Sequence, residues 1–177
     1  GGGRCLRRLV CRSMGLARTW RHLIASRVGT RQRFPRVALD AIENAIAEAE
    51  RGTSAEIRFA IETALDLPDL WRGKPPRERA LETFAQLRVW DSELRNGVLI
   101  YVLMADHDVE IVADRAAAAR ISAAEWEQAC QLIETHFRNR RFREGAVAGV
   151  AAVGALLAAH FPPGAARENQ PNQPALL

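Results

Sequence analysis

The chain has 177 residues, of which 48% are hydrophobic and 26% charged, a composition that fits one globular domain with tails and excludes a disordered or collagen-like protein. The formal net charge is +4 and the sequence pI is about 9.6, but the charge is divided unevenly. Residues 1–39 hold ten Arg and no acidic residue, so the body from residue 40 onward is acidic overall. Because one segment produces the basic pI, nucleic acid is not the expected partner of the folded body.

Residues 1–36 form a basic arm, which we expect to be partly vector-derived or disordered; residues 1–13 precede the first Met. The arm lacks the apolar run of a secretory signal, although its Arg-rich composition overlaps with that of a mitochondrial transit peptide. The three Cys residues do not make a disulfide framework. We therefore expect a cytoplasmic bacterial protein, with peripheral membrane contact through the arm as an open alternative.

The first elements of the body are a helix and a strand. Apolar residues recur every three or four positions from Val37 to Ala49, which predicts a helix with one buried face. In residues 55–62 apolar and more polar side chains alternate, which predicts a strand. A loop over residues 64–74 then leads to a second helix, which Pro75 and Pro76 open.

A β-hairpin follows in the middle of the chain. Residues 98–104 are seven consecutive apolar residues; a strand that is apolar on both faces needs cover on both, so we expect it at the centre of the sheet. Residues 109–113 return as its partner. We expect the connecting turn, with Asp106, His107 and Asp108, to be a plain hairpin turn and not a site.

Two helices complete the domain. Ser122 and Glu125 have the spacing of a capping box, and Cys130 is expected in the core behind it. Residues 145–159 carry no charge but fall short of the ~20 residues that span a bilayer, so their Ala and Gly predict a closely packed core helix. The tail over residues 162–177 is rich in Pro, Asn and Gln and is expected to be disordered. Three tryptophans are expected to pack and not to stack on a ligand: Trp71, Trp90 and Trp126.

The order helix, strand, helix, strand, strand, helix, helix predicts one α/β domain over residues 37–161. Its small mixed sheet would contain one βαβ unit with two parallel strands, followed by the antiparallel hairpin.

Four segments of this domain resemble the TPM domain family, whose name derives from a thylakoid lumen phosphatase-like protein. Residues 96–102 and 108–114 resemble the family's central hairpin, and residues 42–57 look like its first helix, turn and glutamate-bearing strand. Residues 142–145 are similar to the start of its last helix. The resemblance implies an α/β/α sandwich. It also implies a bacterial or plastid protein, acid phosphatase activity as in plant relatives, or binding of divalent cations as in some bacterial ones.

The predicted topology places candidate site residues at two rims of the sheet. One rim gathers Asp66 and Asp69 with the hairpin turn. The family-like residues lie on the opposite rim, where oxygen ligands from several loops suit calcium or magnesium. Candidate metal ligands are Glu56, Asp91 and Asp114, with Asn96 and Arg115 as candidate substrate contacts; no catalytic residue is assigned.

Two departures from the family pattern weaken both the metal and the phosphatase hypotheses. Arg95 stands where relatives often have Asp, and the Gly-rich turn after the hairpin is replaced by residues 114–118, which predict the start of a helix. The four histidines also lack the spacing of a zinc site.

The sequence therefore favours a non-catalytic or vestigial module that binds a divalent cation or a partner protein. The alternative is an acid phosphatase that depends on a divalent metal held by Glu56, Asp91 and Asp114. A second alternative is that the basic arm binds nucleic acid or anionic lipid.

Overall fold

The computed structural model describes residues 16–25, 27–92, 94–163 and 174–177. The elements in chain order are α1 (Leu16–Ile24), α2 (Arg27–Arg33), α3 (Arg36–Arg51), β1 (Ile57–Glu62), α4 (Leu67–Trp71), α5 (Pro76–Gln86), β2 (Val98–Leu103), β3 (Asp108–Ala113), α6 (Arg115–Arg120), α7 (Ala123–Arg138), α8 (Phe142–His160) and β4 (Ala175–Leu176).

The described strands form one mixed sheet in the order β3-β2-β1-β4. β1 and β2 are parallel, in a register that pairs Ile57 with Val98 and Glu62 with Leu103. β3 returns antiparallel to β2, and β4 lies parallel to β1 on its outer side. The predicted βαβ unit and hairpin are confirmed, and the carboxyl ends of β1 and β2 meet at the same edge of the sheet.

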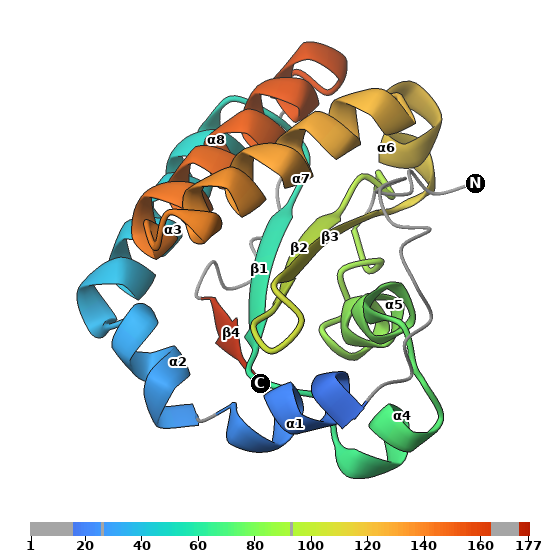
Figure 1. Cartoon of the computed structure of the whole chain (residues 1–177). Helices are drawn as coiled ribbons and strands as arrows, with labels where there is room; N and C mark the ends of the chain where they lie inside the picture. The colour runs from blue at the N-terminus through green and yellow to red at the C-terminus, as the bar shows by residue number, and fades with distance from the viewer. Residues whose placement is uncertain (1–15, 26, 93, 164–173) are drawn as a thin grey trace.

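Helices cover both faces of this sheet, so the fold is the expected α/β/α sandwich (Figure 1). The odd-numbered side chains of β1, such as Phe59, pack with α3, α7 and α8, whereas Ala60 faces Ala80 of α5. Every residue of β2 is buried, which confirms it as the central strand.

α8 is a core helix that lies between α3 and α7 (Figure 1). It is long and apolar enough to cross a membrane by length and composition, but its small residues serve close packing instead. A Cβ atom at Gly149 would lie 2.3 Å from Cγ1 of Ile133, and one at Gly154 would lie 2.6 Å from Cβ of Ala49. Glycine at these two positions lets α8 approach both neighbouring helices.

The structure differs from the sequence prediction at both ends of the domain. Within the arm, which was expected to be partly vector-derived or disordered, Leu16–Ile24 forms α1 and Arg27–Arg33 forms α2. Within the predicted disordered tail, Ala175 and Leu176 form β4, and the Leu177 N–H donates to the Ile61 carbonyl at 2.9 Å. The exposed edge of β1 explains the strand, because its backbone groups need partners. Residues 1–15 and 164–173 lie outside the described residues.

Three local predictions are confirmed and one is partly wrong. The capping box of Ser122 and Glu125 is present, Cys130 is buried, and Trp126 is buried as expected. Trp71 and Trp90, however, are exposed. Trp71 ends the short α4, in which only Leu70 is buried.

Candidate functional site

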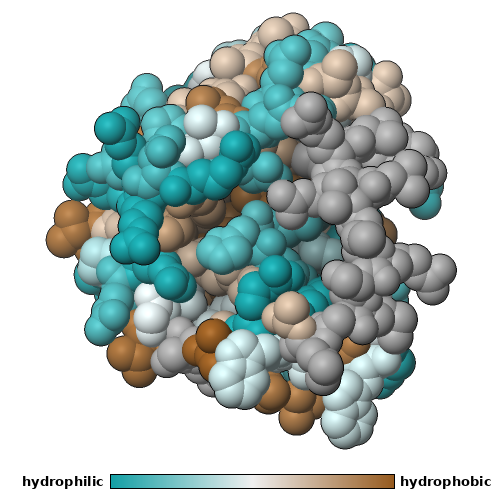
Figure 2. Space-filling view, in the orientation of Figure 1, coloured by the Kyte–Doolittle hydropathy of each residue, from teal (hydrophilic) through white to brown (hydrophobic). Residues whose placement is uncertain are grey.

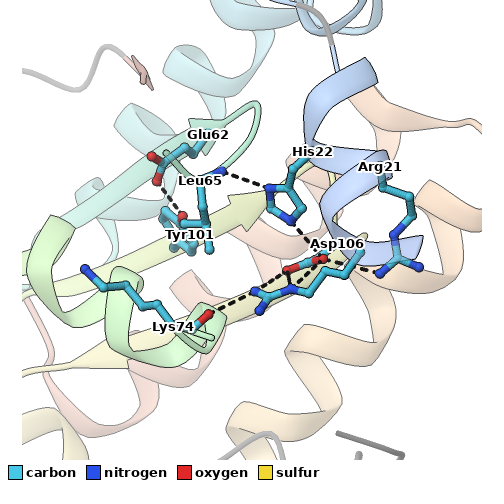
Figure 3. Close-up of polar contacts among 8 residues, drawn as sticks. Arg21, His22, Glu62, Leu65, Lys74, Tyr101 and Asp106 are labelled. Carbon is cyan, nitrogen blue, oxygen red and sulfur yellow. Dashed lines mark hydrogen bonds and ion pairs between the residues drawn. The ribbon is translucent and has the colours of Figure 1, made fainter. Parts of the chain in front are cut away.

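α1 lies across the edge of the sheet where β1 and β2 end (Figures 1 and 3). In open α/β sheets this carboxyl edge is the general position of ligand sites. The chain delivers the β1–α4 loop and the β2–β3 turn to this edge. The side chains of α1 that point inward therefore occupy the position where a ligand would be expected.

Asp106, in the β2–β3 turn, is the centre of the contacts between α1 and the sheet. Its carboxylate accepts hydrogen bonds from Arg18 Nε at 3.0 Å, Arg18 Nη2 at 2.7 Å and His22 Nε2 at 3.0 Å. Arg21 Nη2 lies 3.4 Å away. Burial alone would raise the pKa of Asp106, but the hydrogen bonds from His22 and Arg18 outweigh it and hold that pKa well below its usual range. The carboxylate of Asp106 is therefore held by the basic side chains of α1.

His22 and Arg18 also bind the two loops on either side of α4. The buried His22 ring accepts a hydrogen bond at Nδ1 from the Leu65 N–H at 3.0 Å. Because Nδ1 accepts, this geometry assigns the proton to Nε2, which donates to Asp106. Arg18 Nη2 donates to the Lys74 carbonyl at 2.9 Å. Two side chains thus tie α1 to three segments that are distant in sequence.

A second polar network lies beside the first, on the α5 side of the sheet. The Tyr101 hydroxyl donates to Glu62 Oε2 at 2.5 Å, and Arg79 Nε donates to both oxygens of the same carboxylate at 3.1 and 2.9 Å. Burial and the negative charge of Glu62 raise the pKa of Tyr101 far above its usual value. Lys74 Nζ lies 2.8 Å from Asp69 and 2.7 Å from Glu82. The carboxylates of this network are therefore paired with basic side chains.

The opposite rim gathers the family-like segments, as the sequence predicted. The Val98 N–H donates to the Glu56 carbonyl at 2.8 Å, and the Asp114 N–H donates to the Gly97 carbonyl at 2.9 Å. Gly97 is required there, since a Cβ atom would lie 2.1 Å from the Val89 carbonyl oxygen. Backbone contacts therefore hold these segments side by side.

The candidate site residues of this rim differ in their exposure and in their contacts. Asp114 caps α6 by accepting a hydrogen bond from the Arg115 N–H at 2.7 Å. Asn96 is buried, whereas Asp91 and Arg115 are exposed. In the described part of the chain, no group of three or more His, Cys, Asp or Glu side chains is placed to hold a metal ion. Glu56, Asp91 and Asp114 are thus not assembled into a ligand set.

The contact between His22 and Asp106 was missed by sequence reasoning, which assigned α1 to the arm and Asp106 to a plain turn. A local signal was present in residues 16–24. Arg18 and His22 share one helical face, and Trp20, Leu23 and Ile24 point elsewhere. No local pattern in the sequence indicates that Asp106 is the partner of these side chains, because it lies 84 positions from His22.

Comparisons with known proteins agree with this architecture. No curated protein matches the chain. Among solved structures, the chain is similar to the NMR structure of the BA42 protein from the psychrophilic bacterium Bizionia argentinensis. The two share 30% sequence identity and a TM-score of 0.69, over 78% of this chain and 92% of that one. The family model of the TPM domain matches residues 32–156. The chain therefore belongs to the TPM domain family.

Proposed function

We propose that this TPM domain is a non-catalytic binding module and not a phosphatase. The observation that supports the proposal most directly is the position of α1. Arg18 and Arg21 pair with the Asp106 carboxylate, and His22 donates a hydrogen bond to it, at the edge of the sheet where a ligand or substrate would be expected.

A metal-dependent phosphatase needs carboxylate oxygens that are available to a cation, which in turn holds the phosphate and activates water. At the carboxyl edge of the sheet, which α1 lies across, a cation at Asp106 would have to displace the guanidinium of Arg18 and the imidazole of His22. Such charge-assisted bonds are among the strongest hydrogen bonds in proteins. At the opposite rim, Asp114 is engaged as a helix cap.

The same contacts favour a macromolecular partner over a divalent cation as the ligand of the module. A cation would compete with the protein's own basic side chains for Asp106 and Glu62. A macromolecular partner needs only an accessible surface and does not compete for these carboxylates.

Hydrolysis of p-nitrophenyl phosphate tests this proposal, with Mg²⁺, Mn²⁺ or Ca²⁺ added to the wild-type chain. Asp114→Asn and Asp106→Asn would be assayed beside it, with Asp40→Asn as a control on the exposed surface of α3. We expect all four proteins to show the same background rate. A metal-dependent rate in the wild type that Asp114→Asn or Asp106→Asn abolishes, and Asp40→Asn retains, would contradict the proposal.

A calcium or magnesium titration followed by NMR separates the two kinds of ligand. If the module binds a macromolecule, amide shifts should stay small and scattered. Saturable shifts confined to one rim would instead support a cation site there, for instance around Glu56 and Asp114.

A further inference from the structure

α1 presents its polar face to the protein and its apolar face to water, the reverse of an ordinary surface helix. The His22 side chain is fully buried against Asp106. On the other side of the helix, Trp20 is 64%, Leu23 56% and Ile24 61% exposed. The hydrogen bonds to Asp106, Leu65 and Lys74 fix this orientation. The apolar residues are therefore held outward by the fold and are not frayed ends.

Two neighbouring helices also carry exposed apolar side chains. In α2, Val28 is 64% exposed, and in α4, Leu67 is 44% and Trp71 73% exposed. α1 lies along α4, because it is hydrogen bonded to Leu65 before that helix and to Lys74 after it. Brown hydrophobic groups, separated by paler ones, lie along the lower edge of Figure 2, where Figure 1 places α1 and α4. We call this surface the docking face: Trp20, Leu23, Ile24, Val28, Leu67 and Trp71.

Basic residues accompany the docking face. The segment that forms α1 and α2 contains no acidic residue. Exposed Arg21 lies in α1, exposed Arg31 in α2 and exposed Arg72 directly after α4. Of the nearby acidic residues, Asp106 and Asp69 are paired with basic side chains, and Asp66 is exposed. The local charge is therefore positive, although the body of the chain is acidic.

We infer that the docking face binds the surface of an anionic membrane. Tryptophan side chains favour the headgroup boundary, aliphatic side chains enter the acyl region, and Arg side chains reach anionic headgroups. The inference goes beyond the proposed function and does not depend on it, because a catalytic domain would dock through the same face.

Charge complementarity selects the membrane over a second copy of the chain. A symmetric dimer through this face would bring the Arg-bearing surfaces of two protomers together, which opposes association. Anionic lipid supplies the opposite charge and accepts apolar side chains at the same time. The contacts of α1 with Asp106 also keep the apolar side chains in place before binding, which lowers the ordering cost.

Vesicle flotation with the full chain tests this inference. The vesicles would be phosphatidylcholine alone, or phosphatidylcholine mixed with phosphatidylglycerol. The variant Trp20→Ser/Leu23→Ser removes two members of the docking face, and Trp90→Ser/Leu132→Ser is the matched control, because both of its residues are exposed elsewhere. All substituted side chains are at least 38% exposed, and urea unfolding verifies that both variants remain folded.

We expect the wild type and the control to float with the mixed vesicles and much less with phosphatidylcholine alone. The docking-face variant should lower the partition coefficient about 10- to 100-fold. Absence of flotation with the mixed vesicles would overturn the inference, as would equal loss in the two variants. A concentration-dependent dimer in sedimentation velocity that only Trp20→Ser/Leu23→Ser dissolves would overturn it in favour of a second copy.

Discussion

Asp106 shows how one carboxylate can fix the position of a helix. Its partners come from a single face of α1, and its side chain is only 9% exposed. We expect Asp106→Asn to lower the free energy of unfolding by about 2–3 kcal/mol, because Arg18 and His22 would keep a poorer, uncharged acceptor. Asp40→Asn, which breaks the exposed pair with Arg36, should change it by less than about 0.5 kcal/mol. Urea unfolding compares the two variants, and equal effects would show that Asp106 does not anchor α1.

The pH dependence of stability follows from the same residue. The pKa of Asp106 is lower in the folded chain than in the unfolded chain, so folding favours its ionised form. The stabilisation that the ionised Asp106 contributes is fully present above the pKa of Asp in an unfolded chain, about 3.9. It is lost as the pH falls through the lower pKa of Asp106 in the folded chain. The stability difference between wild type and Asp106→Asn should therefore narrow below about pH 4. A difference that stays constant down to the acid transition would contradict this assignment.

Tyr101 offers a spectroscopic measurement, because it is the only tyrosine of the chain. Burial and the charge of Glu62 raise its pKa, so the folded protein should show no tyrosinate absorbance at alkaline pH where free tyrosine, with a pKa of about 10, ionises. The absorbance should rise only together with unfolding, monitored by circular dichroism. A reversible titration near the free value in folded protein would show that Tyr101 is accessible to solvent.

For single elements, the packing around a helical glycine decides whether the position tolerates a side chain, and α8 and α2 differ in this respect. Gly149→Ala gains about 1 kcal/mol of helix propensity, but its Cβ meets the fully buried Ile133, and overpacking costs about 1–3 kcal/mol. We expect a net loss of stability. Gly29→Ala in α2 meets only Arg33, at 4.0 Å, and should gain about 0.5–1 kcal/mol. Thermal unfolding of both variants checks the pair, and a stabilising Gly149→Ala would show that α8 packs more loosely than described.

The elements also differ in how well the sequence predicts them. β2 was predictable because every residue is apolar and must be covered on both faces, and the helix of Ser122 was predictable because its capping box is local. β4 was not, because two residues in a Pro-rich tail carry no periodicity and depend on the exposed edge of β1. α1 was missed because its apolar residues face solvent. Apolar residues at helical spacing normally indicate the buried face of a helix, and here they mark the exposed one.

At the scale of the whole molecule, the resemblance to the family was sufficient to predict the sandwich but not the site. The backbone around Glu56, Asn96 and Asp114 lies where the family likeness implied. The chemistry of that rim depends on side-chain directions, and the sequence departs from the family pattern there at Arg95 and at residues 114–118. The α1 rim depends on contacts between residues more than eighty positions apart, which one sequence does not encode in any local pattern. A basic segment that resembled an appendage thus contacts the edge of the sheet.

α1 occupies the carboxyl edge of the sheet through His22 and Asp106. The most direct test is NMR of the ¹⁵N-labelled His22 ring, together with the Leu65 amide. We predict an Nδ1 that carries no proton, an Nε2 that carries a slowly exchanging one, and a contact between the ring and the Leu65 amide proton. In Asp106→Asn the Nε2 proton should exchange faster. Ring nitrogens that average like those of a free imidazole, with no contact to Leu65, would contradict this placement of α1.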